Sequence, residues 1–479
     1  MTFARMKKKI HSLSCLLLLA AASLGQSGAG LLGTWEGKLH VGVALRIVLH
    51  FSRDSAGKIA GTMDSPDQGV NGIPCGEVSL IGDSLHLAIP AVAGHYDGRL
   101  IEDSSIDGRW KQSVSLVLNL KKVIKVSELV RPQTPKPPYP YRSLDLEYDN
   151  LDKTIHYGAT LTIPSGLGPF PAVVLITGSG PQNRDEEIFG HKPFAVIADY
   201  LARRGVEVLR VDDRAVGKST GDFLHATSAD FAQDVNTSLD FLKQRPEVDT
   251  KRIGLIGHSE GGMIAPIVAA GRTDVNFIIL LAGPGVKGSV LLAKQNADIL
   301  LSEGVNAKAV DSFLPVFLGM ESDIMDSPDS ASLNKSLTQT FDQFRKNTPA
   351  PYVLATTNVY NDSTEQAYVK GISTQMNTAW FRYFLSFEPS RYLEKLHCRV
   401  LALNGSRDLQ VAPDINLGAI KEALHKSHSR HYDLEKIPGL NHLFQTCNKC
   451  QVEEYGELEE TFSPVALKVM GDWIDRETK

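Results

Sequence analysis

Short apolar runs that alternate with longer helical patterns are the feature that most constrains the fold of this chain. The runs are rich in Val, Ile and Leu and cover residues 172–177, 206–211, 252–257, 277–282 and 400–404. Strands that are buried on both faces of a parallel sheet have this composition. The alternation with helices therefore predicts a doubly wound, mostly parallel α/β sheet.

Other stretches of the 479-residue chain do not follow this pattern, which indicates more than one domain. Residues 286–395 contain no strand-like run and show helical spacing with several aromatics, so we expect an inserted helical cap. Residues 127–143 are rich in proline, which removes backbone donors and favours an extended linker. The α/β domain is then predicted to cover residues 144–479.

Residues 26–126 show short alternating apolar runs separated by turn residues, which predict a small all-β domain. The triplets that begin at Gly33 and Gly108 end in tryptophan and resemble the Gly-x-Trp signature of lipocalin-like barrels. A tryptophan that closes one end of the core is the simpler interpretation, and a ligand-binding role is the alternative.

The first 25 residues have the layout of a secretory signal peptide. Positive charges on Arg5 and on the lysines of residues 7–9 precede an apolar stretch at 13–24, and small and polar residues follow it. The stretch is shorter than the ~20 residues of a membrane-spanning helix. We therefore expect residues 1–25 to be removed and the mature protein to be exported, to the periplasm or the medium, without a membrane span.

Composition and charge limit the possible partners. Hydrophobic residues at 42% and charged residues at 22% are typical of a globular protein. Loss of the four positive charges in residues 1–25 would take the formal net charge from -5 to -9. A chain of this charge has no electrostatic reason to bind nucleic acid or anionic lipid, so neither partner is expected.

The strongest chemical signal is a Gly-x-Ser-x-Gly motif, Gly257 to Gly261, at the point where a predicted strand must turn directly into a helix. A nucleophilic serine needs such a tight turn because the turn exposes its hydroxyl oxygen, and the flanking glycines avoid collisions with the neighbouring strand and helix. The turn also places Ser259 at a helix N-terminus, where developing negative charge is favoured. The motif therefore predicts Ser259 as a nucleophile.

A serine hydroxyl becomes reactive when a histidine base, oriented by an acid, takes its proton. Asp408 follows the predicted strand at 400–404, and His442 lies in a loop further along, so nucleophile, acid and base have the order known for such triads. Asp433 and Asp414 are the alternative acids. The other histidines of this half compete less well: His258, His425, His428 and His431.

An acyl-transfer site also needs donors for the oxyanion of the tetrahedral intermediate. The residue after the nucleophile, Glu260, supplies one backbone amide in such folds, and the loop after the 172–177 strand supplies the other. That loop begins Gly-Ser-Gly, so the amide of Ser179 is the candidate. A tight turn without a catalytic role is the alternative.

These segments together resemble bacterial α/β-hydrolase esterases of the EstD type, over about residues 144–479. The resemblance rests on ordered motifs at residues 178–182, 212–214, 258–262, 404–408 and 441–444. It implies an α/β-hydrolase fold, hydrolysis of short acyl esters, the triad of Ser259, Asp408 and His442, a cap over the site and no cofactor. One departure is Ala215, which follows Arg214 where relatives tend to have glycine.

Two other functions stay open. A serine aminopeptidase would use the same fold and triad, with an acidic cluster for the substrate amino terminus, for which Glu365, Glu388 and Glu394 are candidates without diagnostic spacing. A binding protein whose functional part is the β-domain is less favoured. The partner expected is thus a small-molecule ester, and the sequence predicts no oligomeric state.

Two further motifs favour neither a nucleotide nor a metal. Gly217-Lys218-Ser219 resembles the end of a phosphate-binding loop, but Asp212 stands where that loop needs its first glycine. Cys447 and Cys450 form a lone C-x-x-C without a second pair at zinc spacing, so a local disulfide or two free thiols is favoured over zinc.

Overall fold

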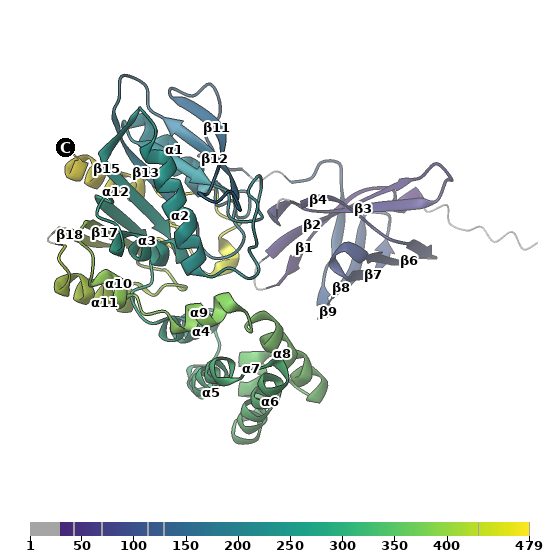
Figure 1. Cartoon of the computed structure of the whole chain (residues 1–479). Helices are drawn as coiled ribbons and strands as arrows, with labels where there is room; N and C mark the ends of the chain where they lie inside the picture. Colours follow the sequence, from purple (N-terminus) through teal and green to yellow (C-terminus); the bar gives the residue numbers. More distant parts are fainter. Residues whose placement is uncertain are drawn as a thin grey trace, which may run out of the picture. The chain divides into compact units, whose positions relative to one another are not determined.

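A computed structural model describes residues 29–41, 44–68, 70–112, 115–127, 130–429 and 431–478, so the predicted signal peptide at 1–25 lies outside the described residues. The chain divides into two compact units, each with its own sheet (Figure 1). One unit holds the described residues of Met1–Gly37, Val48–Met63 and Gly72–Val126. The other holds those of Lys38–Ile47, Asp64–Asn71 and Ser127–Lys479.

The first sheet has ten strands in the order β4-β3-β2-β1-β10-β8-β7-β6-β5, and β9 pairs with β8. The pairs from β1 through β10, β8, β7 and β6 to β5 are antiparallel. The bounds are β1 Gly33–His40, β2 Ala44–Arg53, β3 Ile59–Ser65, β4 Val70–Pro74, β5 Val78–Ile81, β6 Ser84–Ile89, β7 Gly94–Ile101, β8 Ser105–Lys111, β9 Ser115–Val117 and β10 Leu120–Val123.

Both tryptophans of the Gly-x-Trp triplets lie in the core of this unit. Trp35 is fully buried, and its indole Nε1 donates to the carbonyl of Leu31 at 2.7 Å. Trp110 is also buried, and its ring packs over Gly94, where a Cβ would lie 2.4 Å from the indole. The contacts of both rings are those of core residues, as in the simpler interpretation of the triplets.

The second sheet has eight strands in the order β11-β12-β14-β13-β15-β16-β17-β18. The strands from β14 to β18 run parallel, whereas β12 is antiparallel to both β11 and β14. The bounds are β11 Arg142–Asp149, β12 His156–Ile163, β13 Phe170–Ile176, β14 Glu207–Val211, β15 Val248–His258, β16 Phe277–Leu281, β17 Arg399–Gly405 and β18 Tyr432–Ile437. The predicted mostly parallel sheet is thus confirmed.

Helices cover both faces of this sheet, and a separate apolar cluster lies between the helices and the sheet on each face. One cluster joins it to α1 and α12, and the other joins it to α2, α10 and α11; α3 contributes to both. The bounds are α1 Pro193–Arg203, α2 Ser228–Lys243, α3 Glu260–Ala270, α10 Ser390–Leu393, α11 Pro413–Lys426 and α12 Pro464–Thr478. Among the described residues, no helix is both long and apolar enough to cross a membrane.

A group of helices interrupts the sheet between β16 and β17, as the sequence predicts. Six of these helices are grouped together (Figure 1). They surround an aromatic core of their own that includes Phe313, Phe341 and Phe381. Their bounds are α4 Gly288–Ser302, α5 Ala307–Asp326, α6 Ser330–Asn347, α7 Ala350–Thr357, α8 Asp362–Gln375 and α9 Ala379–Ser386. We refer to α4–α9 as the cap.

Candidate active site

Ser259 lies in the turn between β15 and α3, and its backbone has φ 52° and ψ -114°. Residues other than glycine rarely adopt a positive φ, so the surroundings must hold this conformation. A Cβ at Gly257 would lie 2.0 Å from the carbonyl oxygen of Gly261, and one at Gly261 would lie 2.1 Å from that of Ile176 in β13. Strand and helix approach so closely that the flanking positions admit glycine alone.

Asp408 and His442, which the sequence predicts as acid and base, meet through a hydrogen bond. Asp408 lies in the turn after β17, and its Oδ2 is 2.9 Å from Nδ1 of His442. The other oxygen of Asp408 accepts from the amides of Gln410 at 2.8 Å and Val411 at 2.9 Å. Both residues are buried, at 3% and 4% exposure. A buried carboxylate held in this way fixes the orientation of the imidazole and stabilises its protonated form.

The alternative acids are bound elsewhere. Asp433 accepts from Trp473 Nε1 at 2.8 Å and pairs with Arg476. Asp414 forms an exposed ion pair with Lys436. Since neither carboxylate contacts His442, Asp408 is the acid that the geometry favours.

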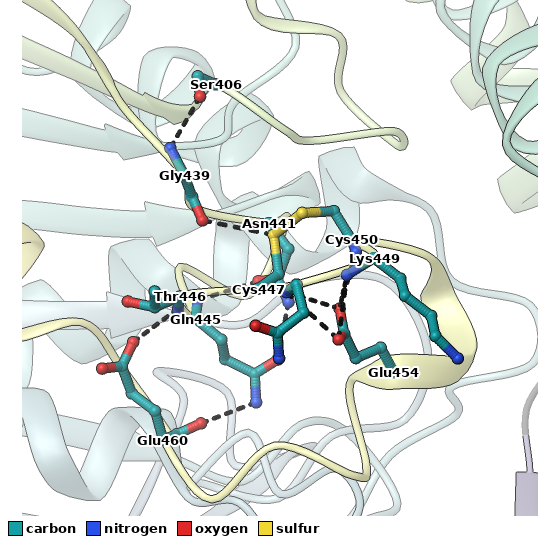
Figure 2. The surroundings of a disulfide bond; sticks show 11 residues. Ser406, Gly439, Asn441, Gln445, Thr446, Cys447, Lys449, Cys450, Glu454 and Glu460 are labelled. Atoms are coloured by element: carbon teal, nitrogen blue, oxygen red, sulfur yellow. Dashed lines mark hydrogen bonds between the residues drawn. A yellow bond between two sulfur atoms is a disulfide. The ribbon is translucent and has the colours of Figure 1, made fainter.

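The loop that carries His442 is a short hairpin closed by backbone contacts (Figure 2). Leu440 and Thr446 form an isolated bridge, and the amide of Cys447 donates to the carbonyl of Gly439 at 3.2 Å. Cys447 is joined to Cys450 by a disulfide, one of the two states that the sequence left open. The disulfide therefore lies next to the base of the hairpin.

Glu454 organises the turn that the disulfide closes. Its carboxylate accepts from the amides of Lys449 and Cys450, the latter at 2.7 Å (Figure 2). Cys447, Cys450 and Glu454 are also the only group among the described residues with metal-like ligand spacing, but both sulfurs are engaged in the disulfide.

The loop after β13, residues 177–186, carries the predicted oxyanion donor. Asp213 holds both ends of its first turn, because Thr177 Oγ1 donates to Oδ1 at 2.7 Å and the amide of Gln182 donates to Oδ2 at 2.9 Å. Burial raises the pKa of Asp213 to about 8, although these two hydrogen bonds oppose the shift. The neighbouring carboxylates Glu260 and Glu186 raise it further.

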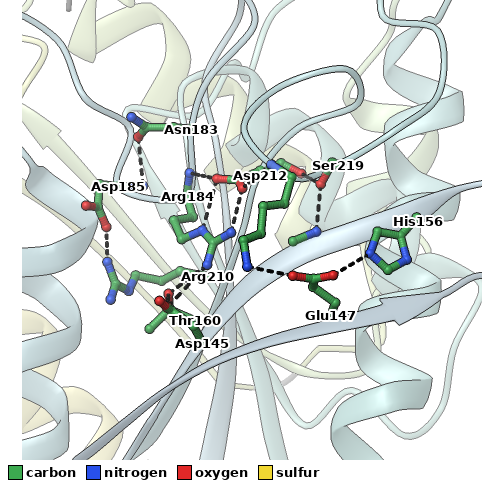
Figure 3. A network of polar contacts seen from close by, with 12 residues as sticks. Asp145, Glu147, His156, Thr160, Asn183, Arg184, Asp185, Arg210, Asp212 and Ser219 are labelled. Carbon is green, nitrogen blue, oxygen red and sulfur yellow. Dashed lines mark hydrogen bonds and ion pairs between the residues drawn. The ribbon is translucent and has the colours of Figure 1, made fainter.

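Arg184 fixes the next part of the same loop (Figure 3). Its guanidinium binds Asp212 through Nε at 3.0 Å and Nη2 at 2.6 Å, and its own amide donates to Asp212 at 2.9 Å. Arg184 also donates to Thr160 at 3.0 Å. The Asp212-Asp213 pair at the end of β14 therefore clamps the whole loop to the sheet, a role that the sequence analysis did not assign.

The predicted oxyanion donors belong to the two segments next to the nucleophile, the loop after β13 and the start of α3. A Cβ at Gly178 would lie 3.4 Å from the Cβ of Ser259, so the loop passes directly beside the nucleophile, and Ser179 follows. Glu260 is the first residue of α3. In the described part of the chain, neither the Ser179 amide nor the Glu260 amide donates to a backbone carbonyl in a turn or cap. Both amides therefore stay the candidates for binding an oxyanion.

The side chain of Glu260 has a second function that sequence reasoning missed. It is buried, and its Oε1 accepts from Ser228 Oγ of α2 at 2.6 Å and from Trp380 Nε1 of α9 at 2.8 Å. Burial raises the pKa of Glu260, while the two hydrogen bonds lower it. Glu260 thus connects the nucleophile turn to the cap.

His258 and Glu186 form another contact that the sequence analysis missed. His258 Nδ1 lies 3.0 Å from Oε1 of Glu186, and both side chains are buried. Burial alone would lower the pKa of His258, but Glu186, the carbonyl of His442 and Asp408 together raise it. The sequence signal that could have revealed this contact is Glu186 itself, an acidic residue eight positions after Gly178 in the loop that follows a central strand.

The strand order, the reversed second strand and the serine turn after β15 define this unit as an α/β hydrolase. Residues 192–445 match the model of a hydrolase family described as serine aminopeptidase, S33. This match covers more than half of the chain, so the protein belongs to that family.

Individual relatives are more distant. Esterase EstD of Thermotoga maritima is 32% identical over 174 residues, which are 36% of this chain and 42% of the esterase. The chain thus matches about two fifths of the length of that relative. An esterase of Pyrococcus furiosus is 14% identical and covers 74% of this chain and 100% of its own, with a TM-score of 0.42. Est1E of Butyrivibrio proteoclasticus, solved with ferulic acid, is 16% identical, with 68% and 96% coverage and a TM-score of 0.37.

Proposed function

We propose that this protein is a serine hydrolase that cleaves carboxylic esters of small acyl groups through an acyl-enzyme intermediate. The observation that carries the proposal is the 2.9 Å contact between Asp408 and His442, together with the strained turn that presents Ser259. The similarity to Esterase EstD supports an ester as the substrate.

In the first half of the reaction, Ser259 Oγ attacks the ester carbonyl carbon while Nε2 of His442 takes the hydroxyl proton. The carbonyl π electrons move to the oxygen, which the amides of Ser179 and Glu260 bind. The tetrahedral intermediate collapses, the C–O bond to the alcohol breaks, and His442 gives its proton to the leaving alkoxide. Water then attacks the acyl-serine by the same route and releases the acid and Ser259.

A serine aminopeptidase is the second candidate, because the family description names that activity. Two of the acids suggested for holding a substrate amine are occupied: Glu365 pairs with Arg345, and Glu394 pairs with Lys426 at 3.1 Å. These ion pairs favour the ester.

A hydrolysis screen separates the two candidates. Purified protein is assayed with p-nitrophenyl acetate, butyrate and longer esters beside aminoacyl p-nitroanilides, with Ser259→Ala as the background. We expect turnover of the short esters and little turnover of the anilides. A higher kcat/KM for the anilides than for the esters would favour the peptidase over the esterase. If neither substrate class is cleaved in a way that depends on Ser259, both functions are rejected.

We also propose that the protein acts after export, to the periplasm or the medium. The tribasic, apolar start of the chain supports this, as does the Cys447–Cys450 disulfide, because disulfides persist in oxidising compartments. The mature N-terminus of the cell-fractionated protein, read by intact-mass spectrometry, tests the proposal. An unprocessed chain in the cytosolic fraction would reject it.

A further inference from the structure

Three loops of the candidate site converge on one buried side chain, His258. Its Nδ1 faces Oε1 of Glu186 at 3.0 Å, and its Nε2 faces the carbonyl oxygen of His442 at 3.1 Å. The same Glu186 oxygen accepts from the amide of Gly178 at 2.6 Å. Gly178, Glu186, His258 and His442 therefore form one continuous chain of contacts from the oxyanion loop, past the residue before Ser259, to the loop of the base.

We propose that His258 and Glu186 share one proton in a buried pair that holds the oxyanion loop and the His442 loop in position around Ser259. This inference rests on the proposed function. His258 and Glu186 are positioning residues here, since neither is assigned a contact with substrate.

The contacts of His258 require a hydrogen on each of its ring nitrogens. The carbonyl of His442 can only accept, so Nε2 of His258 carries a hydrogen. Oε1 of Glu186 already accepts from the Gly178 amide, and a second proton must lie between this oxygen and Nδ1 for the 3.0 Å contact to be a hydrogen bond. When that proton leaves, two lone pairs face each other in a site that excludes water, and the contact breaks.

The surroundings of His258 favour keeping this proton. The charged and titratable groups that face it are Glu186 from the loop after β13, Asp408 after β17, and His442, whose ring centroid is 4.9 Å from that of His258. His258 is 6% exposed and Glu186 is 5% exposed, so solvent screens their attraction weakly. Because both ring nitrogens of His258 are engaged, it cannot replace His442 as the base.

The pair therefore predicts an alkaline limit to activity that belongs to His258 and not to His442. As pH rises and the shared proton is lost, both loops lose their common anchor, and kcat should fall more than KM changes.

Glu186→Gln tests the shared proton. The glutamine oxygen can still accept from Gly178, but a buried His258 without a carboxylate gives up its proton at lower pH. We expect kcat at pH 8 to fall about tenfold or more and the alkaline limit of kcat/KM to move down by at least about one pH unit. Glu187→Gln, at the adjacent position, is the matched control and should keep the wild-type profile.

His258→Gln gives the complementary result, because its amide does not titrate. Its activity should be lower at neutral pH, and its profile should lack the alkaline limit. An unchanged alkaline limit in both variants, or equal losses in all three variants, would overturn the proposal. Rates of Ser259 labelling by an organophosphonate give the same profiles without an ester substrate.

Proton NMR of the full-length protein examines the shared proton without any turnover. We expect two far-downfield imidazole N–H resonances, one from the His442–Asp408 pair and one from His258. The His258 resonance should persist into alkaline pH, remain in Ser259→Ala and disappear in Glu186→Gln, whereas the His442 resonance should remain in Glu186→Gln. Absence of the second resonance from the wild type would overturn the proposal. If the wild type neither cleaves esters nor reacts with the organophosphonate, the proposed function fails, while the His258 resonance still decides the inference.

Discussion

His442 and His258 are two buried histidines with ring centroids 4.9 Å apart, and each faces a buried carboxylate. His442 meets Asp408 through Nδ1 at 2.9 Å, and no hydrogen bond involves its Nε2 among the described residues. His258 is held at both nitrogens, by Glu186 and by the His442 carbonyl. A general base needs a free nitrogen, so nearly equal environments give one histidine for proton transfer and one for positioning.

Asp408 and Glu186, the carboxylates that these histidines face, differ in the number of amide donors that bind them. Asp408 accepts two backbone amides and one side-chain amide, from Asn404, before it meets His442. Among the amides of the described residues, Glu186 accepts from that of Gly178 alone. The donors around Asp408 fix the carboxylate that orients His442, whereas Glu186 is held mainly by its contacts with Gly178 and His258.

The largest effect is expected from replacing Ser259, because only His442 has a nitrogen available to activate it. Ser259→Ala should lower ester hydrolysis by about 10⁶-fold, because the nucleophile is lost while the fold remains. Labelling by a fluorescent organophosphonate, followed on a gel, checks this. Persistent labelling of the variant would show that another residue is the nucleophile.

Asp408→Asn removes the carboxylate charge that faces His442 but keeps the size of the side chain, and it should lower kcat by about 10⁴-fold. Circular dichroism should show an unchanged fold. Asp433→Asn, at the rejected alternative acid, is the control and should retain most of the activity. The opposite ranking of these two variants would move the acid to Asp433.

Asp213→Asn tests whether the hydrogen bonds of Asp213 to Thr177 and Gln182 depend on the charge of its carboxyl group. The folded-state pKa of Asp213, about 8, lies above the unfolded value, so its stabilising effect is present at low pH and is lost as pH rises through about 8. Asparagine can still pair with Thr177 and Gln182 but does not titrate. The difference in Tm between wild type and variant should therefore shift in favour of the variant between about pH 4 and 8 and stay constant above that range. A constant difference would show that Asp213 is ionised throughout.

The smallest effect is expected at the disulfide. Cys447→Ser with Cys450→Ser opens a link between residues only three apart in sequence, which constrains the unfolded chain little. The hairpin keeps its backbone contacts, so activity should fall only a few-fold. Cys75→Ser, in the other unit, controls for the general effect of thiol loss. Complete inactivation by the double substitution would show that the disulfide positions His442.

Much of the catalytic unit could be predicted from the sequence because buried parallel strands and the Gly-x-Ser-x-Gly turn have strong local patterns. The predicted runs correspond to β13 through β17. β11, β12 and β18 were not predicted. The edge strands β11 and β18 alternate between exposed and half-buried positions, which resembles surface structure, and the antiparallel pairing of β12 has no local signal.

The site residues also divide into those that a local sequence motif predicts and those that only the fold brings together. Ser259, Asp408 and His442 stand in motifs whose spacing reflects their chemistry, so they can be proposed from sequence. Glu186 and His258 act through contacts between segments 72 positions apart. Sequence reasoning set His258 aside as a competing base, and only the fold reveals its two partners.

The contact between Glu260 and Trp380 has a consequence for protein engineering. Cap helices are attractive parts to exchange between relatives when new specificities are sought. Here the helix that carries Trp380 also completes the hydrogen bonds of a carboxylate directly beside the nucleophile, so a graft that omits this indole would leave a buried acid short of a donor. A transplanted cap should therefore bring its own indole, or the host should receive Glu260→Gln at the same time.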